Sequence, residues 1–288
     1  MLALAIGLVG VLAVGSSGQI PAGQLAGVRH YSGENVAPVF EGWEKNVDGS
    51  FSMVFGYLNR NYEEQPEIPV GPNNNFSPGS ADRGQPTHFY TRRQQFMFKV
   101  RVPGDFGNQE LVWTLTRSGR TEKAVGHLAL EWELSEIVYS QNRAGLNRDS
   151  VTAKPNKAPT IASEASGPVA GGVGSPITLS FTAGDDGVPE PPPPPARRGG
   201  PAQEPTLITT RQGPVQQAVI RPARQGLTVT WTHWRGAGAV KFEPQSLVVK
   251  DGKATTQAVF SAPGTYVVRA YADDGVLLEV SDVTVTVK

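Results

Sequence analysis

The chain contains no cysteine. Disulfides, thiolate zinc sites, iron–sulfur clusters, cysteine nucleophiles and lipid attachment through cysteine are therefore excluded. Charge is also sparse, at 18% of residues, and the 26 basic side chains are balanced by 26 acidic ones. A general polyanion binder needs a surplus of Lys and Arg to neutralise phosphates, so nucleic acid is not an expected partner.

Glycine and proline, in contrast, are abundant: 33 and 24 of the 288 residues. Together they exceed the usual share of roughly 12%. This excess favours many turns over long helices, and no long stretch shows the apolar spacing i, i+3, i+4, i+7 of an amphipathic helix. At about 100–200 residues per domain, the length suggests two domains.

Residues 1–14 read MLALAIGLVGVLAV, which is apolar and uncharged. The run is shorter than the roughly 20 residues that a bilayer span needs. Followed by the small residues Gly15-Ser16-Ser17-Gly18, it fits a secretory signal peptide over residues 1–18. The first basic residue is Arg29, so the usual charged n-region is missing, and a buried strand or helix of the mature fold is the alternative. We expect no membrane span in the mature chain and a location outside the cytoplasm: periplasm, cell surface or medium.

Apolar side chains recur at every second residue over most of the remaining chain, as in half-buried strands. Asp48-Gly49, Ser118-Gly119 and Asp251-Gly252 separate such runs, and these pairs suit tight hairpins. The pattern predicts an all-β fold with two β-sandwich domains in tandem, over residues 30–140 and 158–288. Residues 141–157, which include Lys154-Pro155-Asn156, are expected to form the linker. The alternating positions are Phe51, Met53, Phe55 and Tyr57, then Phe96, Phe98, Val100 and Val102, then Leu128, Leu130, Trp132 and Leu134, then Ile177, Leu179 and Phe181.

One motif in the C-terminal half is more specific. Phe260-Ser261-Ala262-Pro263-Gly264-Thr265-Tyr266 is followed by Ala272-Asp273-Asp274-Gly275 and by valines that alternate with threonines over 283–287. This stretch resembles a PKD-type immunoglobulin-like domain, although it carries a long insertion and lacks the Trp-x-Phe-Gly-Asp-Gly form of the motif. The resemblance implies a β-sandwich module without catalysis, used as a spacer, adhesive or presentation unit. The N-terminal half resembles uncharacterised secreted bacterial β-domains, which implies no activity.

Two long segments lack periodicity. Residues 63–90 are expected to bind a ligand through Arg83, His88 and Tyr90, or to form an ordered cover over a sheet edge. The insertion over 184–226 contains the run Pro191–Pro195, which favours polyproline II. It is expected to be either a recognition arm for an acidic or aromatic partner surface or a low-complexity excursion that interacts only with solvent.

Two Asp-Asp-Gly sequences suggest a cation site. If the strands on either side of the insertion are B and C, the insertion and the F–G loop lie at one end of the sandwich. Asp185 and Asp186 would then approach Asp273 and Asp274, and a weak calcium site is predicted, with turn chemistry as the alternative. No other cofactor is expected.

Familiar catalytic motifs are absent from the sequence: H-E-x-x-H, G-x-S-x-G and the phosphate-binding loop. Glu131 and Glu133 would lie roughly 7 Å apart on one strand face, which overlaps the carboxylate spacing of inverting glycosidases but also fits a solvated exterior. His233 is expected to be a hydrogen-bonded histidine at a strand end. Trp234 has the opposite parity and is expected to be exposed, as a possible binding residue.

These observations predict an exported, non-catalytic β-sandwich protein for cell-surface structure, adhesion or partner binding. Its partner would be a protein or polysaccharide at the cell surface. A carbohydrate-binding protein that uses Trp43, Trp234 or the loop aromatics is the alternative. A secreted hydrolase using Glu131 and Glu133 is a third. A row of exposed aromatic rings would favour the second class of protein, and two partly buried carboxylates in a cleft would favour the third.

Overall fold

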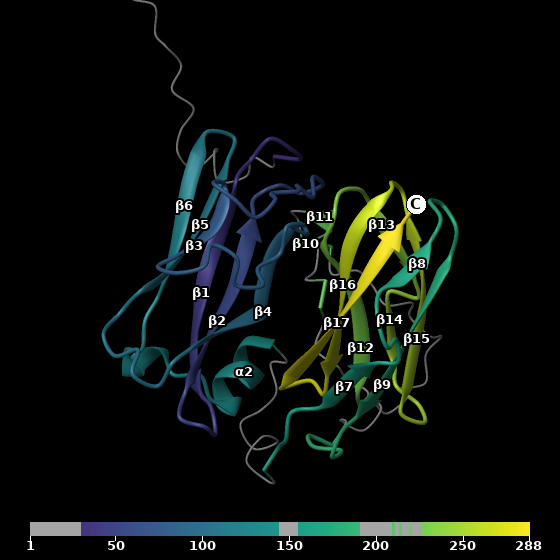
Figure 1. Ribbon diagram of the computed structural model, residues 1–288. Helices are drawn as coiled ribbons and strands as arrows, with labels where there is room; N and C mark the ends of the chain where they lie inside the picture. The colour runs from purple at the N-terminus through teal and green to yellow at the C-terminus, as the bar shows by residue number, and fades with distance from the viewer. Residues whose placement is uncertain (1–29, 144–154, 191–208, 211–212, 215–218, 221–225) are drawn as a thin grey trace, which may run out of the picture.

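The computed structural model describes residues 30–143, 155–190, 209–210, 213–214, 219–220 and 226–288. The chain forms two β-sandwich domains that lie side by side (Figure 1). The predicted signal peptide and the proline run of the insertion lie outside the described residues. None of the helices in the described segments has the length and apolarity that crossing a bilayer requires.

The first domain consists of two three-stranded antiparallel sheets, in the orders β1-β2-β4 and β3-β5-β6. The strands are β1 (Val36–Lys45), β2 (Phe51–Asn59), β3 (Asn74–Ser77), β4 (Arg92–Val102), β5 (Leu111–Arg117) and β6 (Arg120–Gly126).

The core of the first domain lies between these two sheets and is rich in aromatic rings. Phe55 on β2 is fully buried and packs against Phe76, Phe98 and Trp113 from the neighbouring strands. On β5, Leu111, Trp113 and Leu115 are buried while the residues between them are partly exposed, as the alternation predicts. Each buried aromatic side chain removes about 150–250 Å² from water, which contributes about 4–6 kcal/mol before the loss of conformational entropy.

The strand predicted over residues 128–134 is wrong. The chain leaves the sheet at Gly126 and forms a 3-10 helix, η1 (Leu130–Trp132), then the α-helix α2 (Glu136–Arg143). The backbone of this segment hydrogen-bonds to Trp43 near the end of β1. The Trp43 indole N–H donates to the Ala129 carbonyl, and the backbone N–H of Leu134 donates to the Trp43 carbonyl. Leu130 and Trp132, expected in the core, are exposed. The apolar alternation therefore does not reflect a half-buried strand.

The second domain packs a four-stranded sheet, β13-β15-β9-β7, against a five-stranded sheet, β14-β12-β16-β17-β8. All neighbours are antiparallel except β8, which runs parallel to β17. The short pair β10–β11 lies within the insertion. The strands are β7 (Thr160–Ser163), β8 (Val169–Gly171), β9 (Ile177–Gly184), β10 (Thr209–Thr210), β11 (Gly213–Pro214), β12 (Thr228–Arg235), β13 (Val240–Glu243), β14 (Ser246–Val248), β15 (Lys253–Phe260), β16 (Gly264–Asp273) and β17 (Leu278–Val287).

This strand order is that of an immunoglobulin-like sandwich, with β7, β9, β15 and β13 as one sheet and β12, β16 and β17 at the centre of the other. Trp231, on the strand equivalent to C, is fully buried in the core. The Tyr266 hydroxyl, at the start of β16, lies 2.7 Å from the Ala262 carbonyl four residues upstream. This is the tyrosine corner of such folds. The predicted all-β class and the two tandem sandwiches are confirmed.

Two predicted hairpins have the backbone that tight turns require. Ser118 and Gly119 have φ of 52° and 72°, and Asp251 and Gly252 have φ of 56° and 70°. Positive φ at both central residues defines a type I′ turn, which matches the twist of the flanking strands.

Candidate functional site

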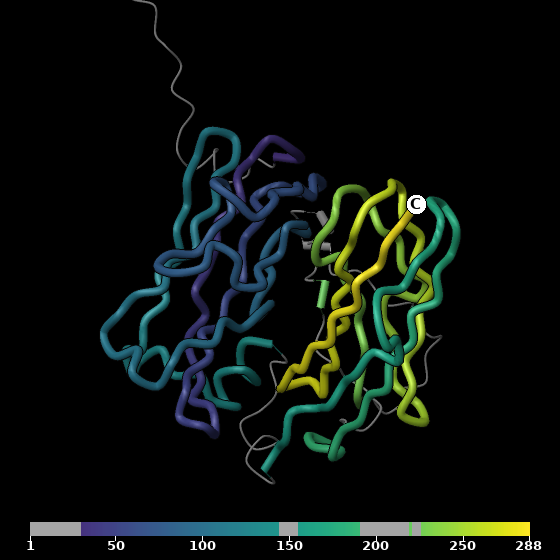
Figure 2. Tube along the Cα trace, viewed as in Figure 1, coloured from purple at the N-terminus to yellow at the C-terminus, as the bar shows by residue number. Residues whose placement is uncertain are grey.

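The two central strands of the five-stranded sheet of the second domain, β12 and β16, are buried on both faces. Every residue from Val229 to Trp234 on β12 is buried, and so is every residue from Val268 to Asp273 on β16. An antiparallel sheet normally leaves one face to water, so continuous burial requires a cover. The first domain supplies it: β4 and the loop over 63–90 face β12, β16 and β17 (Figures 1 and 2).

We call this contact of β4 and the loop over 63–90 with β12, β16 and β17 the joint. Trp234 lies at its centre, and the prediction that Trp234 is exposed is wrong. The register of β12 against β16 shifts between His233 and Arg235, which places Trp234 in a β-bulge. A bulge re-aims side chains and breaks the parity on which the prediction rested. The Trp234 side chain is only 2% exposed; its N–H donates to the Gly84 carbonyl at 3.0 Å, and the Arg269 guanidinium lies 3.8 Å from the ring centroid.

Hydrogen bonds from the loop over 63–90 and from β4 reach the second domain directly. The backbone N–H of His233 donates to the Tyr90 hydroxyl at 2.8 Å, and that of Thr87 donates to the Trp234 carbonyl at 3.0 Å. The Tyr271 hydroxyl donates to the Met97 carbonyl at 2.9 Å in a fully buried position. The loop is therefore an ordered cover over a sheet, which is one of the two outcomes that the sequence allowed.

Two ion pairs join the domains at different depths. Arg143 at the end of α2 lies 2.6 Å from Asp273 at the end of β16, and these side chains are 5% and 1% exposed. Arg235 holds Asp82 through two hydrogen bonds of 2.7 and 2.9 Å at the surface. The Arg235 hydrogen bond is the largest cause that lowers the pKa of the Asp82 carboxyl.

Two histidines, one from each domain, meet in this joint. The rings of His88 and His233 are stacked, with centroids 4.3 Å apart, and the His88 Nδ1 lies 2.5 Å from the Glu67 Oε1. The His233 Nδ1 lies 3.7 Å from the same oxygen. Glu67 and His88 are held opposite each other by an antiparallel bridge inside the loop.

His233 is 1% exposed, and within the described chain neither of its ring nitrogens has a hydrogen-bond partner. The prediction of a hydrogen-bonded histidine is therefore wrong. Burial, with a smaller contribution from His88, lowers the pKa of this imidazole from 6.5 to about 3, although the nearby backbone of Gly236 and Arg235 opposes the shift. The ring is neutral at physiological pH.

In the part of the chain that the structure describes, Glu67, His88 and His233 are the one group of three or more acidic or histidine side chains placed to hold a metal ion. Their ligand atoms lie within 4.8 Å of one another. Sequence reasoning missed this group because Glu67 stands in an aperiodic loop and the histidines lie far apart in the chain. Only the packing of the two domains brings them together.

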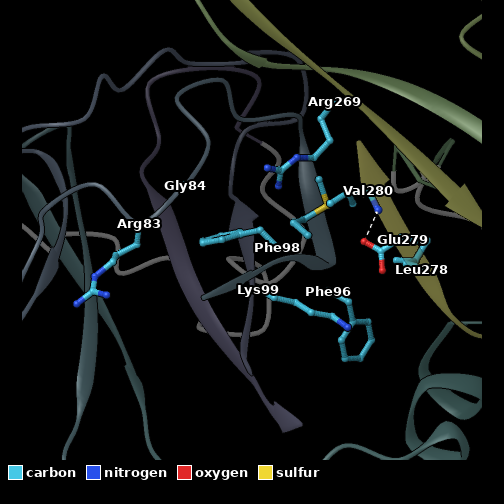
Figure 3. Close-up of a pocket in the computed structure, with 10 residues that line it drawn as sticks. Arg83, Gly84, Phe96, Phe98, Lys99, Arg269, Leu278, Glu279 and Val280 are labelled. Carbon is cyan, nitrogen blue, oxygen red and sulfur yellow. Dashed lines mark hydrogen bonds between the residues drawn. The ribbon is translucent and has the colours of Figure 1, made fainter. Parts of the chain in front are cut away.

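The four residues predicted to contact a ligand all reach this joint. His88, Tyr90 and Trp234 are bonded or stacked within it, as described above. Arg83 borders a cavity of about 180 Å³ between β4 and the β16–β17 pair. Figure 3 shows Phe98, Arg269 and Leu278 around that space, with the Arg83 guanidinium directed away from it. The joint thus employs three of the four residues in contacts between the domains.

Two of the cations at the cavity are already paired. Arg269 pairs with Asp282 through two hydrogen bonds of 2.7 Å, and Lys99 lies 2.7 Å from Glu44. The remaining lining includes Phe96, Met97, Leu278 and Val280, together with the carboxylate of Glu279. The cavity is therefore a small, largely apolar gap in the packing of the two domains, with charged side chains at its border.

The two Asp-Asp-Gly turns meet at one end of the second domain, as the strand assignment predicts. Asp185 is close enough to contribute to the raised pKa of Asp274, for which burial is the main cause. Asp274 accepts from the backbone N–H groups of Val276 and Leu277 and from Asn156. Asp185 and Asp186 accept from their own turns in the same way, and Asp273 pairs with Arg143. Calcium binding at these carboxylates stays a prediction.

Of the residues named for the two alternative functions, Trp43, Glu131 and Glu133 lie outside the joint. Trp43 is buried beneath η1, so neither it nor Trp234 offers a ring to a sugar. Glu131 and Glu133 are exposed on and beside η1, and neither lines the cavity described above.

One part of the insertion touches the joint. The backbone N–H of Val219 donates to the Gln94 side chain on β4 at 3.0 Å, and Ile220 is buried in the same cluster as Trp234 and Tyr271. This segment of the insertion is packed against both domains rather than exposed to solvent.

No protein-family model matches the chain, and no curated protein matches it. Several solved structures are similar at low identity. Domains 4 and 5 of the S-layer protein SbsC give a TM-score of 0.26 with 10% identity, covering 62% of this chain and 65% of that one. A longer SbsC structure is covered over 23% of its length, so this chain spans less than two thirds of either S-layer structure.

Two further similar structures are built from tandem modules. The fibronectin(III)-like modules of CbhA from Clostridium thermocellum give a TM-score of 0.25 with 12% identity, covering 88% of this chain and 90% of theirs. The D0-D1 domain of intimin also gives 0.25 with 12% identity, covering 88% and 100%. TM-scores this low carry no conclusion about function.

Proposed function

We propose that this chain is an exported, non-catalytic protein of cell-surface structure, adhesion or partner binding, with a second domain of the PKD type. The observation that carries the proposal is the joint. It buries the outer face of β12 and β16 and so fixes two sandwiches in one orientation. A rigid pair of sandwiches suits a structural or presenting role because the surfaces that remain outside keep a constant relative position.

The opposite sheet of the second domain is the surface we propose for the partner. Apart from Lys253 at the start of β15, the exposed outward positions of β9 and β15 are uncharged: Thr178, Thr182, Thr255 and Gln257. Gln257 donates to Thr178 at 2.9 Å, and the Thr255 and Ser180 hydroxyls are 3.3 Å apart. Such a flat, hydrogen-bonding face fits a protein or polysaccharide better than a polyanion.

Cell fractionation followed by sedimentation with the cell envelope tests the proposal. We expect the protein outside the cytoplasm, and we expect the purified chain to sediment with envelopes from the same cells. Thr255→Lys should weaken this sedimentation, since it places a charge on the proposed surface. Thr121→Lys is the matched control, because Thr121 is an exposed strand residue of the first domain with a cross-strand hydroxyl partner of its own. A cytoplasmic pool alone, or equal binding by the two variants, would contradict the proposal.

A further inference from the structure

We propose that Glu67, His88 and His233 form a binding site for a divalent transition-metal ion of the zinc class, which bridges the two domains. This inference is independent of the proposed function, since it concerns the inside of the joint and not an outer surface. The two domains contribute unequally: Glu67 and His88 come from the first and His233 from β12 of the second.

The spacing of the three ligand atoms fits such an ion. Zinc holds nitrogen and oxygen ligands at about 2.0–2.2 Å in a tetrahedron, so neighbouring ligand atoms lie roughly 3.3 Å apart. The Glu67 Oε1 lies 2.5 Å from the His88 Nδ1 and 3.7 Å from the His233 Nδ1, on either side of that value, and all three ligand atoms lie within 4.8 Å of one another. The coordination geometry is reached by shifts of about 1 Å together with a rotation of the stacked rings that turns both nitrogens toward the ion.

His233 supplies an independent reason for a ligand. A neutral imidazole carries one N–H donor and one acceptor nitrogen, and a buried polar group without a partner costs free energy. Both ring nitrogens of His233 lack a partner among the described residues, in a side chain with 1% exposure. The nitrogen that faces Glu67 is the one an ion would engage.

The chemistry of the set selects the class of ion. Two imidazoles and one carboxylate suit zinc, copper, nickel or iron, whereas calcium and magnesium prefer oxygen ligands alone. Groups outside the three ligands are placed to orient them. Gln65 lies 2.9 Å from the His88 Nε2, and the Thr87 hydroxyl lies 3.4 Å from the second Glu67 oxygen.

The site is reached from one side. The Glu67 side chain is 30% exposed, whereas the two histidines lie behind it. An ion arriving there would contact the Glu67 Oε1 and the His88 Nδ1, which already face each other, and would add a bond to His233 of the second domain. Because the ligands come from both domains, an ion should bind the docked arrangement and stabilise it by mass action.

Titration of Zn²⁺ into the full chain, after treatment with EDTA and dialysis, tests the proposal by calorimetry and thermal unfolding. We expect one ion per chain and a higher melting temperature, with no such response to Mg²⁺. His233→Phe keeps a ring against His88 and Tyr266 but removes the ligand, and should weaken Zn²⁺ binding by roughly 100-fold or more. Glu67→Gln should act in the same direction, and His30→Phe, at an exposed histidine, should bind like the wild type.

A measurement on the wild type avoids any effect of the variants on folding. With ¹⁵N-labelled histidine, the ring nitrogens of His88 and His233 should shift on addition of Zn²⁺, while those of His30 and His127 should not. The proposal is overturned if no ion binds at one per chain, if the shifts fall on His30 or His127, or if folded His233→Phe retains wild-type affinity.

Discussion

Arg143 and Asp273 form an ion pair that joins the two domains in a place closed to water, with their nitrogen and oxygen 2.6 Å apart. Arg143 also donates to the Val276 carbonyl, so the guanidinium holds both the end of β16 and the turn that follows it.

Removing one partner of this pair should destabilise the protein strongly. Arg143→Met removes one partner of a buried ion pair, a change that typically costs about 3–5 kcal/mol. Unfolding in urea measures the effect. Arg101→Met is the control: Arg101 pairs with Asp48 at the surface, and exposed pairs contribute about 0–1 kcal/mol. Similar losses in the two variants would contradict the importance of burial here.

Trp234 should be the side chain on which the joint depends most. Trp234→Ala removes the packing on Phe98, the ring under Arg269 and the hydrogen bond to Gly84. We expect a loss of about 3–5 kcal/mol, as for other buried tryptophans. Differential scanning calorimetry should then show two separate transitions, one for each domain. Leu130→Ala, at a leucine that is 78% exposed, should change stability by less than about 0.5 kcal/mol.

The Tyr266 hydroxyl should stabilise the second domain. It lies 2.6 Å from the Ala237 carbonyl and 2.7 Å from that of Ala262, so its proton serves one of two acceptors in part-buried hydrogen bonds. Tyr266→Phe keeps the ring and should cost about 0.5–1.5 kcal/mol, the net contribution of a typical hydrogen bond. Chemical denaturation checks this value, and Tyr31→Phe, at an exposed tyrosine, should be neutral. A neutral Tyr266→Phe would mean that another donor replaces the hydroxyl.

The ionisation of Asp274 should lower the stability of the protein as the pH rises. In the folded protein the pKa of this carboxyl is raised from 3.8 to about 6, mainly by burial. The folded state therefore binds the proton more tightly, and this contribution is complete below pH 3.8 and lost as the pH passes through about 6. The melting temperature of Asp274→Asn relative to wild type should rise between pH 4 and pH 8.

Asp82→Asn offers a control of opposite sign. The pKa of Asp82 is lowered, chiefly by its hydrogen bond to Arg235, so its contribution to stability is present above 3.8 and lost as the pH falls. Relative to wild type, this variant should be less stable at neutral pH and equal to it in acid. Parallel pH profiles for Asp274→Asn and Asp82→Asn would contradict both assignments.

Much of the fold could be predicted from local pattern. The strand at Ile177, Leu179 and Phe181 alternates because one face is buried and the other is in water, and the structure agrees. The turns at Ser118-Gly119 and Asp251-Gly252 are equally local, since their residue types tolerate positive φ. Over residues 128–134 the same pattern failed, because the chain there forms η1 and its backbone bonds to strand β1 at Trp43 instead of along a ladder.

The joint could not be predicted in this way. Parity assigns Trp234 to the outside only if the strand is regular and its outer face is wet, and neither condition holds. Nothing in the sequence pattern links His88 to His233, because their contact depends on how two complete domains dock. Of the loop residues predicted to contact a ligand, His88 and Tyr90 contact the second domain, and Arg83 borders the cavity.

The double-sided burial of the β12 and β16 sheet has a consequence for anyone who divides this protein. If the chain were cut between the two domains, the second domain would expose Trp234, Tyr271 and Leu278 to solvent as one apolar patch. Such patches promote self-association and precipitation. The two domains should therefore be expressed or recombined as one unit, although each has a sandwich core of its own.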